Sequence, residues 1–389
     1  MVCFVTIMPL QMRVAVSLGV LITWASTLAQ AQAGLSIDSP REFQVVQRQS
    51  KASGTILVAG LALAGDRAEA RVSGAPSAGR LPGDWTPLTI DAQSHGFRGE
   101  LRVASGGWYK LEVRLTKAGR IVARDAIAHV GVGEVFVVAG QSNATNYGEV
   151  RQQTRTGMVA ALGAAGWQLA NDPQPGVQDR SMKGSFIPAF GDAMYERHRV
   201  PIGVVAVGHG STSVRQWLPK GERFTVPPTM GKFVHAVAPN VWECDGTLFD
   251  GMLAAIQRFS PGGFRALLWH QGESDAHQKP EHDIPAEEYK RLLELVIRRS
   301  RGQAGWDFPW FVAQASYHNP GDPSCPPIRE AQASLWREGV ALEGADTDQL
   351  TGRNRQNGGT GVHFSDQGLA AHGRLWAEKV GAYLDRVLQ

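Results

Sequence analysis

The chain has 389 residues, a formal net charge of +3 at pH 7 and 19% charged residues. This length predicts two domains with enough apolar material to build a core. Because the charge is nearly balanced, with no long basic or acidic block, nothing in the composition predicts binding to nucleic acid or to an anionic membrane surface.

The N-terminus predicts an export signal over residues 1–33. Met12-Arg13 precedes an apolar run from Val14 to Leu28, and Ala29-Gln-Ala-Gln-Ala33 then supplies the small residues of a cleavage site. The apolar run is shorter than a membrane span requires. We therefore expect a mature protein without a membrane anchor, exported to the periplasm or to the outside of the cell.

The sequence holds 3 cysteines. Cys3 belongs to the predicted signal, which leaves Cys244 and Cys325 in the exported protein. Because compartments outside the cytoplasm are oxidising, this even pair is open to two interpretations. The two residues form one disulfide, or they are two unpaired buried thiols.

Residues 34–131 predict a small β-sandwich-like domain. The clearest strand is 108–115, where apolar and charged side chains alternate, and the turn Lys117-Ala-Gly119 leads into a return strand at 120–129. Short strands with frequent turns and no helical period favour an antiparallel sandwich. We find no catalytic constellation in this segment and expect it to support the second domain or to contact carbohydrate. Its other expected strands are 43–47, 55–63 and 97–103.

Residues 132–389 predict a second domain of the α/β class, in which apolar strands alternate with amphipathic helices. This alternation is typical of a doubly wound parallel sheet with helices on both faces, which brings the carboxyl ends of the strands to one edge. The expected strands are 135–139, 202–207, 266–269 and 310–315. The expected helices are 188–198, 248–259, 286–299, 328–338 and 369–387.

Polar residues of reactive types follow the predicted strands, as acyl transfer requires. Ser142, after the first strand, is the candidate nucleophile, and His363 is the candidate base. Glu273 is a carboxylate that could hold the imidazole. The backbone N–H groups of Ser142 and Gly210, with the side-chain amide of Gln271, could form an oxyanion hole. Each residue also has a structural interpretation, as a helix cap, a turn residue or a histidine satisfied in the core.

Four motifs resemble those of a known family. They are Gly140-Gln-Ser-Asn143, the loop from Gly210-Ser-Thr to Trp217, His270-Gln-Gly-Glu273 and Val362-His-Phe364. In this order they resemble the sialate O-acetylesterase-like branch of the SGNH hydrolases, which includes the acetylxylan esterases of carbohydrate esterase family six. The motifs span about residues 134–375, nearly the whole predicted α/β domain.

The resemblance implies a carboxylic ester hydrolase that removes O-acetyl groups from a sugar or polysaccharide. It also implies a three-layer α/β/α fold without a metal or an organic cofactor. Ser142 matches the family's nucleophile, His363 its base, and Gly210 and Gln271 its oxyanion hole. The sequence leaves the sugar open: sialic acid, xylan, another plant polysaccharide and a bacterial surface glycan are all compatible with it.

One position departs from the family pattern. Many SGNH hydrolases carry an aspartate three residues before the catalytic histidine, and Thr360 stands there in this chain. A threonine hydroxyl accepts a hydrogen bond but brings no charge to an imidazolium. The resemblance favours Glu273 as the carboxylate, and the alternatives are a Ser142–His363 dyad or another carboxylate. The other carboxylates are Asp275, Asp348 and Asp366.

Five further residues are candidates for substrate contact. The amides of Gln141 and Asn143 could bind substrate or hold the nucleophile loop. Arg215 and Trp217 suit carbohydrate hydroxyls and ring faces, although Trp217 could equally pack its loop onto the domain. His270 completes the set, as part of the motif that ends in a glutamate. Tyr317, His318 and the Gly- and Asn-rich segment 346–361 are expected near the same edge of the sheet.

Two other functions are compatible with these residues. One is a secreted glycan-binding protein that keeps an esterase fold without turnover, an alternative that Thr360 keeps open. The other is an SGNH lipase or thioesterase that acts on other short acyl esters. The sequence offers no long apolar lid, which argues against this second alternative.

Overall fold

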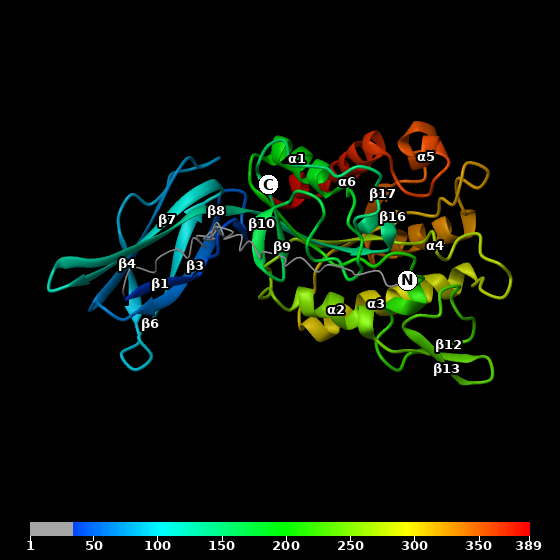
Figure 1. The fold of residues 1–389 in the computed structure, drawn as a ribbon, viewed down its shortest axis with the longest axis horizontal. Helices are drawn as coiled ribbons and strands as arrows, with labels where there is room; N and C mark the ends of the chain where they lie inside the picture. The colour runs from blue at the N-terminus through cyan, green and yellow to red at the C-terminus, as the bar shows by residue number, and fades with distance from the viewer. Residues whose placement is uncertain (1–33) are drawn as a thin grey trace, which may run out of the picture.

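The computed structural model describes residues 34–389. The predicted export signal and Cys3 lie outside the described residues. Within residues 34–389, an all-β part is followed by a mixed α/β part that carries the helices (Figure 1). The two parts lie at opposite ends of the long axis of the molecule (Figure 1).

The all-β part consists mainly of antiparallel strands. Its antiparallel strands before the last are β1 (Leu35–Ser39), β3 (Ser53–Ala62), β4 (Arg67–Ser73), β5 (Thr86–Ile90), β6 (Gly96–Ala104) and β7 (Gly106–Lys117). On β7, Tyr109, Leu111, Val113 and Leu115 are fully buried, as the predicted alternation requires. The predicted turn after β7 is also present, because Ala118 and Gly119 both have positive φ (48° and 78°), as in a two-residue hairpin turn.

Strand β8 (Arg120–Gly140) connects the two parts of the molecule. Its first half pairs antiparallel with β7, and its second half pairs parallel with β11 (Ile202–Ala206) and β15 (Ala266–His270). The sequence pattern predicted two separate strands here, and the structure joins them into one. Gly133 permits the continuous path, because a Cβ there would lie 1.9 Å from the carbonyl oxygen of Pro201. Strand β2 (Gln44–Gln47) pairs parallel with the middle of β8.

The α/β part is organised around a parallel sheet. Next to β11 lies β9 (Val159–Gly163), with β10 (Gly166–Leu169) antiparallel at that edge. Next to β15 lies β16 (Trp310–Gln314), followed by β17 (Leu342–Asp346). Successive residues of β8 point to opposite faces: Val135 and Val137 join one core cluster, and Phe136 and Val138 join another. This confirms the predicted mixed α/β class with a large central sheet.

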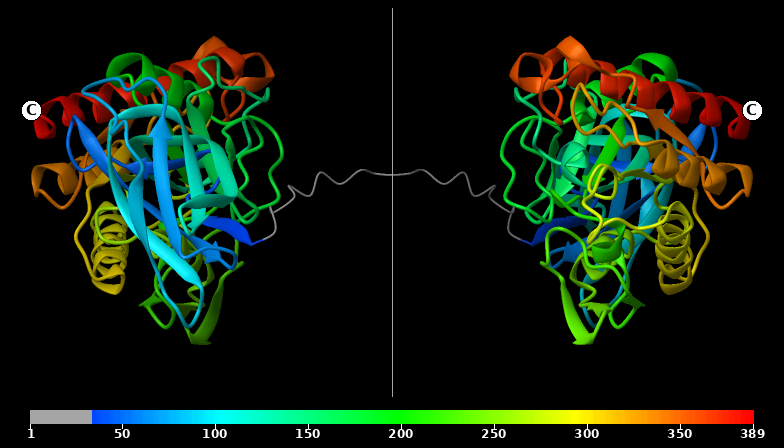
Figure 2. Two further views of the ribbon diagram at one scale, coloured as in Figure 1. Left: turned by 90° about the vertical axis from the view of Figure 1, so that its left-hand side faces the viewer. Right: turned by 90° about the vertical axis from the view of Figure 1, so that its right-hand side faces the viewer.

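Helices cover the sheet on its two faces (Figures 1 and 2). On one face lie α1 (Ile187–His198) and α6 (Asp366–Val387), which pack against Phe136 and Val138. On the other lie α2 (Thr247–Ile256), α3 (Ala286–Ala304) and α4 (Pro326–Arg337), which pack against Val135 and Val137. All five helices were predicted, with ends that differ by a few residues.

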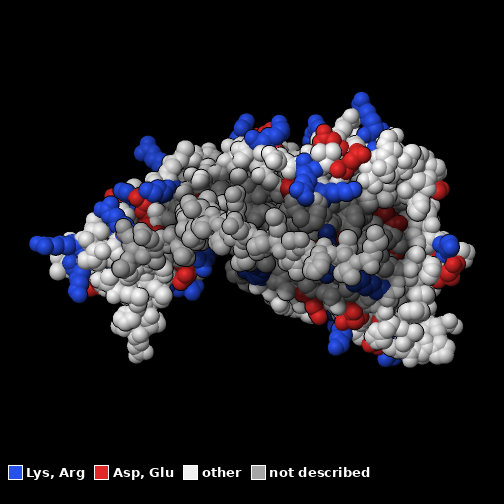
Figure 3. Space-filling view, in the orientation of Figure 1, with Lys and Arg blue, Asp and Glu red and all other residues white. Residues whose placement is uncertain are grey.

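Short elements complete the chain. A small sheet is formed by β12 (Arg223–Phe224), β13 (Val234–Ala238) and β14 (Val241–Cys244). The remaining helical turns are η1 (Ser142–Ala144), η2 (Val214–Trp217), η3 (Gly352–Asn354) and α5 (Gln356–Gly359). On the face shown in Figure 3, acidic and basic side chains are interspersed.

Cys244 and Cys325 are both unpaired. The structure therefore has free thiols rather than a disulfide; Cys244 is buried, and Cys325 is half-buried. Burial raises the pKa of the Cys244 thiol to about 11. Among residues 34–389, no helix is both long enough and apolar enough to cross a membrane.

Candidate active site

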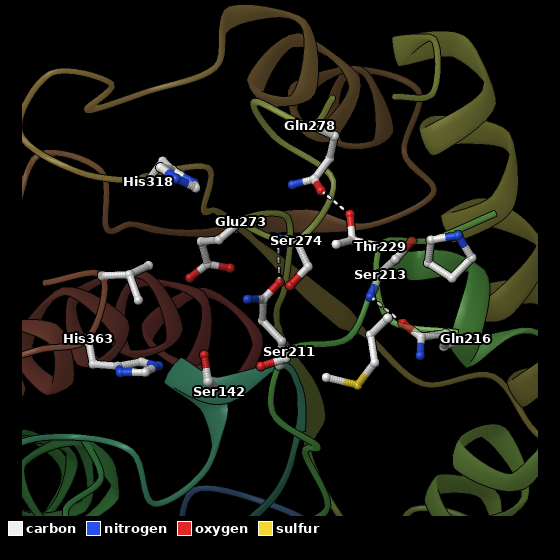
Figure 4. A pocket seen from close by; sticks show the side chains of 14 residues that line it. Ser142, Ser211, Ser213, Gln216, Thr229, Glu273, Ser274, Gln278, His318 and His363 are labelled. Atoms are coloured by element: carbon white, nitrogen blue, oxygen red, sulfur yellow. Dashed lines mark hydrogen bonds between the residues drawn. The ribbon is translucent and has the colours of Figure 1, made fainter. Parts of the chain in front are cut away.

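A cavity of about 730 Å³ opens at the carboxyl ends of the parallel strands. Its walls come mainly from the loops that follow β8, β11, β15 and β16 and from the loop that precedes α6 (Figure 4). These strand ends were predicted to meet at one edge of the sheet. The residues that line the cavity are Gln141, Ser142, Ser211, Ser213, Gln216, Pro228, Thr229, Met230, Glu273, Ser274, Gln278, His318, Val362 and His363.

Ser142 is presented to the cavity by a sharp turn at the end of β8. Gly140 makes the turn with φ of +126°, and a Cβ at this position would lie 2.1 Å from the carbonyl oxygen of His270. Only glycine fits this conformation and this close approach. Ser142 is then the first residue of the short helix η1. The hydroxyl has no hydrogen-bond partner among residues 34–389 and points into the cavity (Figure 4).

The ring of His363 lies beside the Ser142 hydroxyl in the same cavity (Figure 4). Its Nδ1 is 3.0 Å from the side-chain nitrogen of Gln356, and its face stacks on Tyr147 with ring centroids 5.1 Å apart. Nε2 has no partner in the described part of the chain, and no hydrogen bond yet joins it to Ser142. Such bonds are often long in the free enzyme and tighten when substrate binds.

The loop that carries His363 is anchored through the residue before it. The Val362 carbonyl oxygen accepts hydrogen bonds from the Arg355 guanidinium at 2.7 Å and from the Asn143 side chain at 3.3 Å. The guanidinium itself is buried between two aromatic rings, 3.7 Å from the centroid of Tyr317 and 4.2 Å from that of Phe364. These contacts fix the position of the loop relative to the nucleophile turn.

Glu273 lines the cavity but does not bond to His363. Its Oε1 accepts a hydrogen bond from the Asn143 side chain at 2.8 Å and lies 3.0 Å from His270 Nε2. Its Oε2 is buried and has no partner within residues 34–389. Burial raises the pKa of this carboxyl, but His270 and Asn143 outweigh it and lower the pKa to about 2. The Glu273 carboxylate therefore lies in the cavity as predicted, but its histidine partner is His270 and not the predicted His363.

The other candidate carboxylates form hydrogen bonds or ion pairs with residues other than His363. Asp275 accepts from Ser213 Oγ at 2.6 Å and pairs with Arg215, and Asp348 accepts from Ser316 Oγ at 2.6 Å. Asp366 is exposed and accepts from Gln152 at 2.8 Å. Thr360, in the usual aspartate position, is exposed and donates to the Asn357 carbonyl at 2.9 Å. The structure brings none of these four side chains to His363.

The predicted oxyanion donors need a correction. The N–H of Ser142 has no acceptor among residues 34–389, as an oxyanion donor requires. The N–H of Gly210, however, donates to Asp179 at 2.7 Å, and the fully buried Gln271 amide donates to Asp275 at 2.6 Å. In this conformation neither group is available to substrate. Ser211, next along the chain from Gly210, lines the cavity instead, and neither its N–H nor its hydroxyl has a partner within the described residues.

Gln141 and Asn143, the two amides beside the nucleophile, hold the site together. The Gln141 side-chain oxygen accepts from the N–H of Ser274 at 3.0 Å and also lines the cavity. The Asn143 side chain bridges Glu273 and the Val362 carbonyl. Asn143 therefore holds the loops together, and Gln141 holds the Ser274 loop while also lining the cavity.

Arg215, Trp217 and His270 lie outside the cavity, and this corrects their predicted contact with substrate. All three are fully buried. Arg215 forms an ion pair with Asp275 at 3.2 Å, and Trp217 packs edge-on against Trp269 with centroids 5.1 Å apart. His270 lies behind the Glu273 carboxylate. The roles of these three side chains are structural, because a side chain without exposed surface cannot contact a sugar.

Several cavity residues were not predicted. Ser211, Thr229, Met230 and Gln278 lie in loops without a periodic pattern, and Thr229 donates to Gln278 at 2.6 Å. The only signal for them is that the loops after β11 and β15 are rich in polar residues. His318, which was expected near this edge, does line the cavity. In residues 34–389, no group of three or more His, Cys, Asp and Glu side chains is placed to hold a metal ion.

The environment of His363 predicts an enzyme that stays active in acid. Burial lowers the pKa of His363 to about 4, with Lys183 and Arg355 adding to the effect and Glu273 opposing it. A base must be neutral, so kcat/KM should be constant above about pH 5 and fall as pH drops below about 4. The measurement is the pH profile of ester hydrolysis. Lys183→Gln, which removes an exposed positive charge, should move the acid limb slightly upward; a limb near pH 6.5 would show that this buried histidine is not the base.

Comparisons with known proteins add to this geometry. The family model for "Carbohydrate esterase, sialic acid-specific acetylesterase" matches residues 132–382 of the chain. No curated protein has a sequence that matches it.

Two solved structures are similar to the chain at low sequence identity. The chain is similar to a carbohydrate acetylesterase from Xanthomonas citri, at 18% identity and a TM-score of 0.47, over 87% of this chain and 72% of that one. It is also similar to a protein from Arabidopsis thaliana, at 19% identity and a TM-score of 0.44, over 65% of this chain and 98% of that one.

Proposed function

The chain belongs to the sialic acid-specific acetylesterase family of carbohydrate esterases, and from this premise we propose that it removes acetyl groups from a sugar or polysaccharide through a serine acyl-enzyme. The family makes it a carboxylic ester hydrolase. The observation that carries the serine mechanism is the pairing of an unbonded Ser142 hydroxyl with the His363 ring in one cavity.

The proposed first step is attack on the acetyl carbonyl. His363 Nε2, the ring nitrogen without a partner, takes the proton from Ser142 as the serine oxygen bonds to the carbonyl carbon. The Ser142 N–H faces no other acceptor and stabilises the oxyanion, and Ser211 is the neighbouring donor at the cavity wall. His363 then gives this proton to the sugar oxygen as its bond to the carbonyl carbon breaks, so that the sugar leaves with a free hydroxyl. Water activated by the same histidine releases acetate.

The proposed substrate class follows from the cavity. A volume of about 730 Å³ accommodates one or two sugar rings. Thr229 and Gln278 supply hydroxyl and amide groups on the side away from His363 (Figure 4). Such groups match the hydroxyls of a carbohydrate. Sialic acid and xylan are both substrates of the proposed class.

The proposal extends to domain organisation and location. We infer a β domain over residues 34–131 and an SGNH-type three-layer esterase domain over residues 132–389, joined through β8. The N-terminal sequence supports export to the periplasm or beyond the cell. The test of this location is fractionation of cells that express the full chain.

An acyl-chain series tests the proposed function. Rates on p-nitrophenyl esters should fall by about 10-fold or more from acetyl to butyryl and further for longer chains, because a small acyl site rejects added methylenes. The natural substrate class is then found by measuring acetate released from acetylated sialic acids, xylans and bacterial glycans. Faster turnover of an octanoyl ester would favour a lipase or thioesterase, and binding of acetylated glycan without any turnover would favour a glycan-binding protein.

A further inference from the structure

We propose that Gln356 is the positioning residue of the catalytic base: its neutral side-chain amide holds the His363 ring in the tautomer that catalysis needs, where a charged carboxylate would otherwise stand. The inference rests on the proposed function, because it assigns a role within that reaction. It also settles what supports the histidine when Thr360 supplies no charge.

The contacts between the two residues fix the geometry. The Gln356 side-chain nitrogen is 3.0 Å from His363 Nδ1, and the Gln356 backbone N–H donates to the His363 carbonyl at 2.9 Å. The Gln356 carbonyl in turn accepts from the N–H of Gly361 at 3.0 Å. Gln356 therefore holds both the backbone and the ring of His363, from seven positions earlier in the chain.

Gly361 shows how closely the amide is packed. A Cβ at this position would lie 2.3 Å from Cγ of Gln356, so only glycine leaves the side chain in its place. The φ of Gly361 is not in the left-handed region, which means that an alanine here would meet a problem of space and not of backbone conformation. The Gln356 side chain is thus confined between Gly361 and the ring of His363.

The positions of the hydrogens on the His363 ring show what the contact with Gln356 does chemically. A base that accepts the Ser142 proton at Nε2 must carry its own hydrogen on Nδ1, and that N–H needs an acceptor. The amide of Gln356 offers an oxygen and a nitrogen that exchange places by rotation about one bond. Neither atom has another partner among residues 34–389. The amide can therefore turn its oxygen to Nδ1 at no cost in other hydrogen bonds and stabilise the basic tautomer.

The positions of the hydrogens on His270 and His372 explain why Glu273 does not hold the His363 ring. The indole N–H of Trp376 can only donate, and it lies 3.0 Å from Nε2 of His372. That nitrogen is therefore an acceptor, so Nδ1 of His270, 3.1 Å away, must carry a hydrogen. The other nitrogen of His270 faces Glu273 Oε1 at 3.0 Å. One proton lies in this contact, whichever atom holds it, and the Glu273–His270 pair carries no net charge.

Other groups around His363 leave the amide as its hydrogen-bonding partner. Tyr147 stacks on the ring face, and the charges that act on the ring are Lys183, Arg355 and the compensated Glu273. None of these four makes a hydrogen bond to the ring within the described residues. The amide is therefore the contact that sets the tautomer and the rotation of the ring.

The experiment compares the full chain with Gln356→Glu and Gln356→Met. In Gln356→Glu the new carboxylate should raise the pKa of His363 by about 1–3 units, and the acid limb of kcat/KM should move up with it. In Gln356→Met the ring loses its acceptor, so kcat should fall about 10²-fold at unchanged KM. Nitrogen NMR of His363 should show hydrogen on Nδ1 in the unmodified protein and a mixture of tautomers in Gln356→Met.

Two further variants complete the design. Gly361→Ala displaces the amide without replacing it and should reproduce the loss in kcat. Gln367→Glu adds a charge in the first turn of α6, just after the His363 loop, at an exposed residue that does not touch the ring, and should change neither the NMR titration nor the rate. Wild-type kcat in Gln356→Met, together with an unmoved His363 titration in Gln356→Glu, would overturn the proposal. If the unmodified protein released no acetate, the proposed function would fail, and the NMR titration would still decide the role of Gln356.

Discussion

Ser142→Ala should lower kcat for acetate release by roughly 10⁶-fold, the loss typical of a removed serine nucleophile. The variant keeps the cavity and its other donors, so it should still bind acetylated sugar. It should also remain folded, because the Ser142 hydroxyl makes no hydrogen bond within residues 34–389 and its removal leaves no buried group unsatisfied. The measurement is acetate release with stability followed by urea unfolding.

Two controls sharpen this result. Ser105→Ala removes another buried hydroxyl without a partner, in the β part of the molecule, and should leave the rate unchanged. The double variant Ser142→Ala/His363→Ala should be no slower than Ser142→Ala alone, because residues that act as a unit do not add. Appreciable turnover by Ser142→Ala would show that Ser142 is not the nucleophile and that another residue of the cavity has this role.

Glu134→Gln should destabilise the protein by about 3–5 kcal/mol, the cost of leaving buried charges without their partner. Glu134 is fully buried at the point where β8 passes from the antiparallel to the parallel sheet. It accepts from Arg48 at 2.6 Å, from Gln47 at 2.8 Å and from Arg265 at 2.7 Å. The glutamine has the same shape but leaves both guanidinium groups without a counter-charge.

The measurement is the urea midpoint at constant m-value. Glu288→Gln is the matched control, because Glu288 pairs with Arg291 on the exposed side of α3, where such a pair is worth at most about 1 kcal/mol. Equal effects of the two variants on the free energy of unfolding would show that the stability of the segment around Glu134 in β8 does not depend on the buried charge. A change in m-value would show instead that the two parts of the molecule no longer unfold together.

Long elements with a strong period could be predicted from the sequence. Helices α3 and α6 were predicted because their apolar residues recur at helical spacing and face the sheet. β8 was divided into two strands because its pattern changes from alternating to continuously apolar near Val130, where its surroundings change from a half-exposed sheet to a core covered on both faces. The edge strand β17 was missed because Leu-Glu-Gly-Ala-Asp has no apolar period.

The sequence by itself determined the class of the fold and predicted which residues gather at the edge of its sheet. Apolar periods predict strands and helices locally, and reactive residue types at strand ends make Ser142, Glu273 and His363 the candidates for catalysis. The hydrogen bonds among these residues depend on tertiary structure alone. Asn143 bonds to Glu273, which lies 130 positions later in the chain. The packing of three loops decides that the Glu273 carboxylate contacts His270 and that the His363 ring contacts Gln356. Hydrogen bonds depend on tenths of an ångström between segments distant in sequence, and no local pattern encodes such distances.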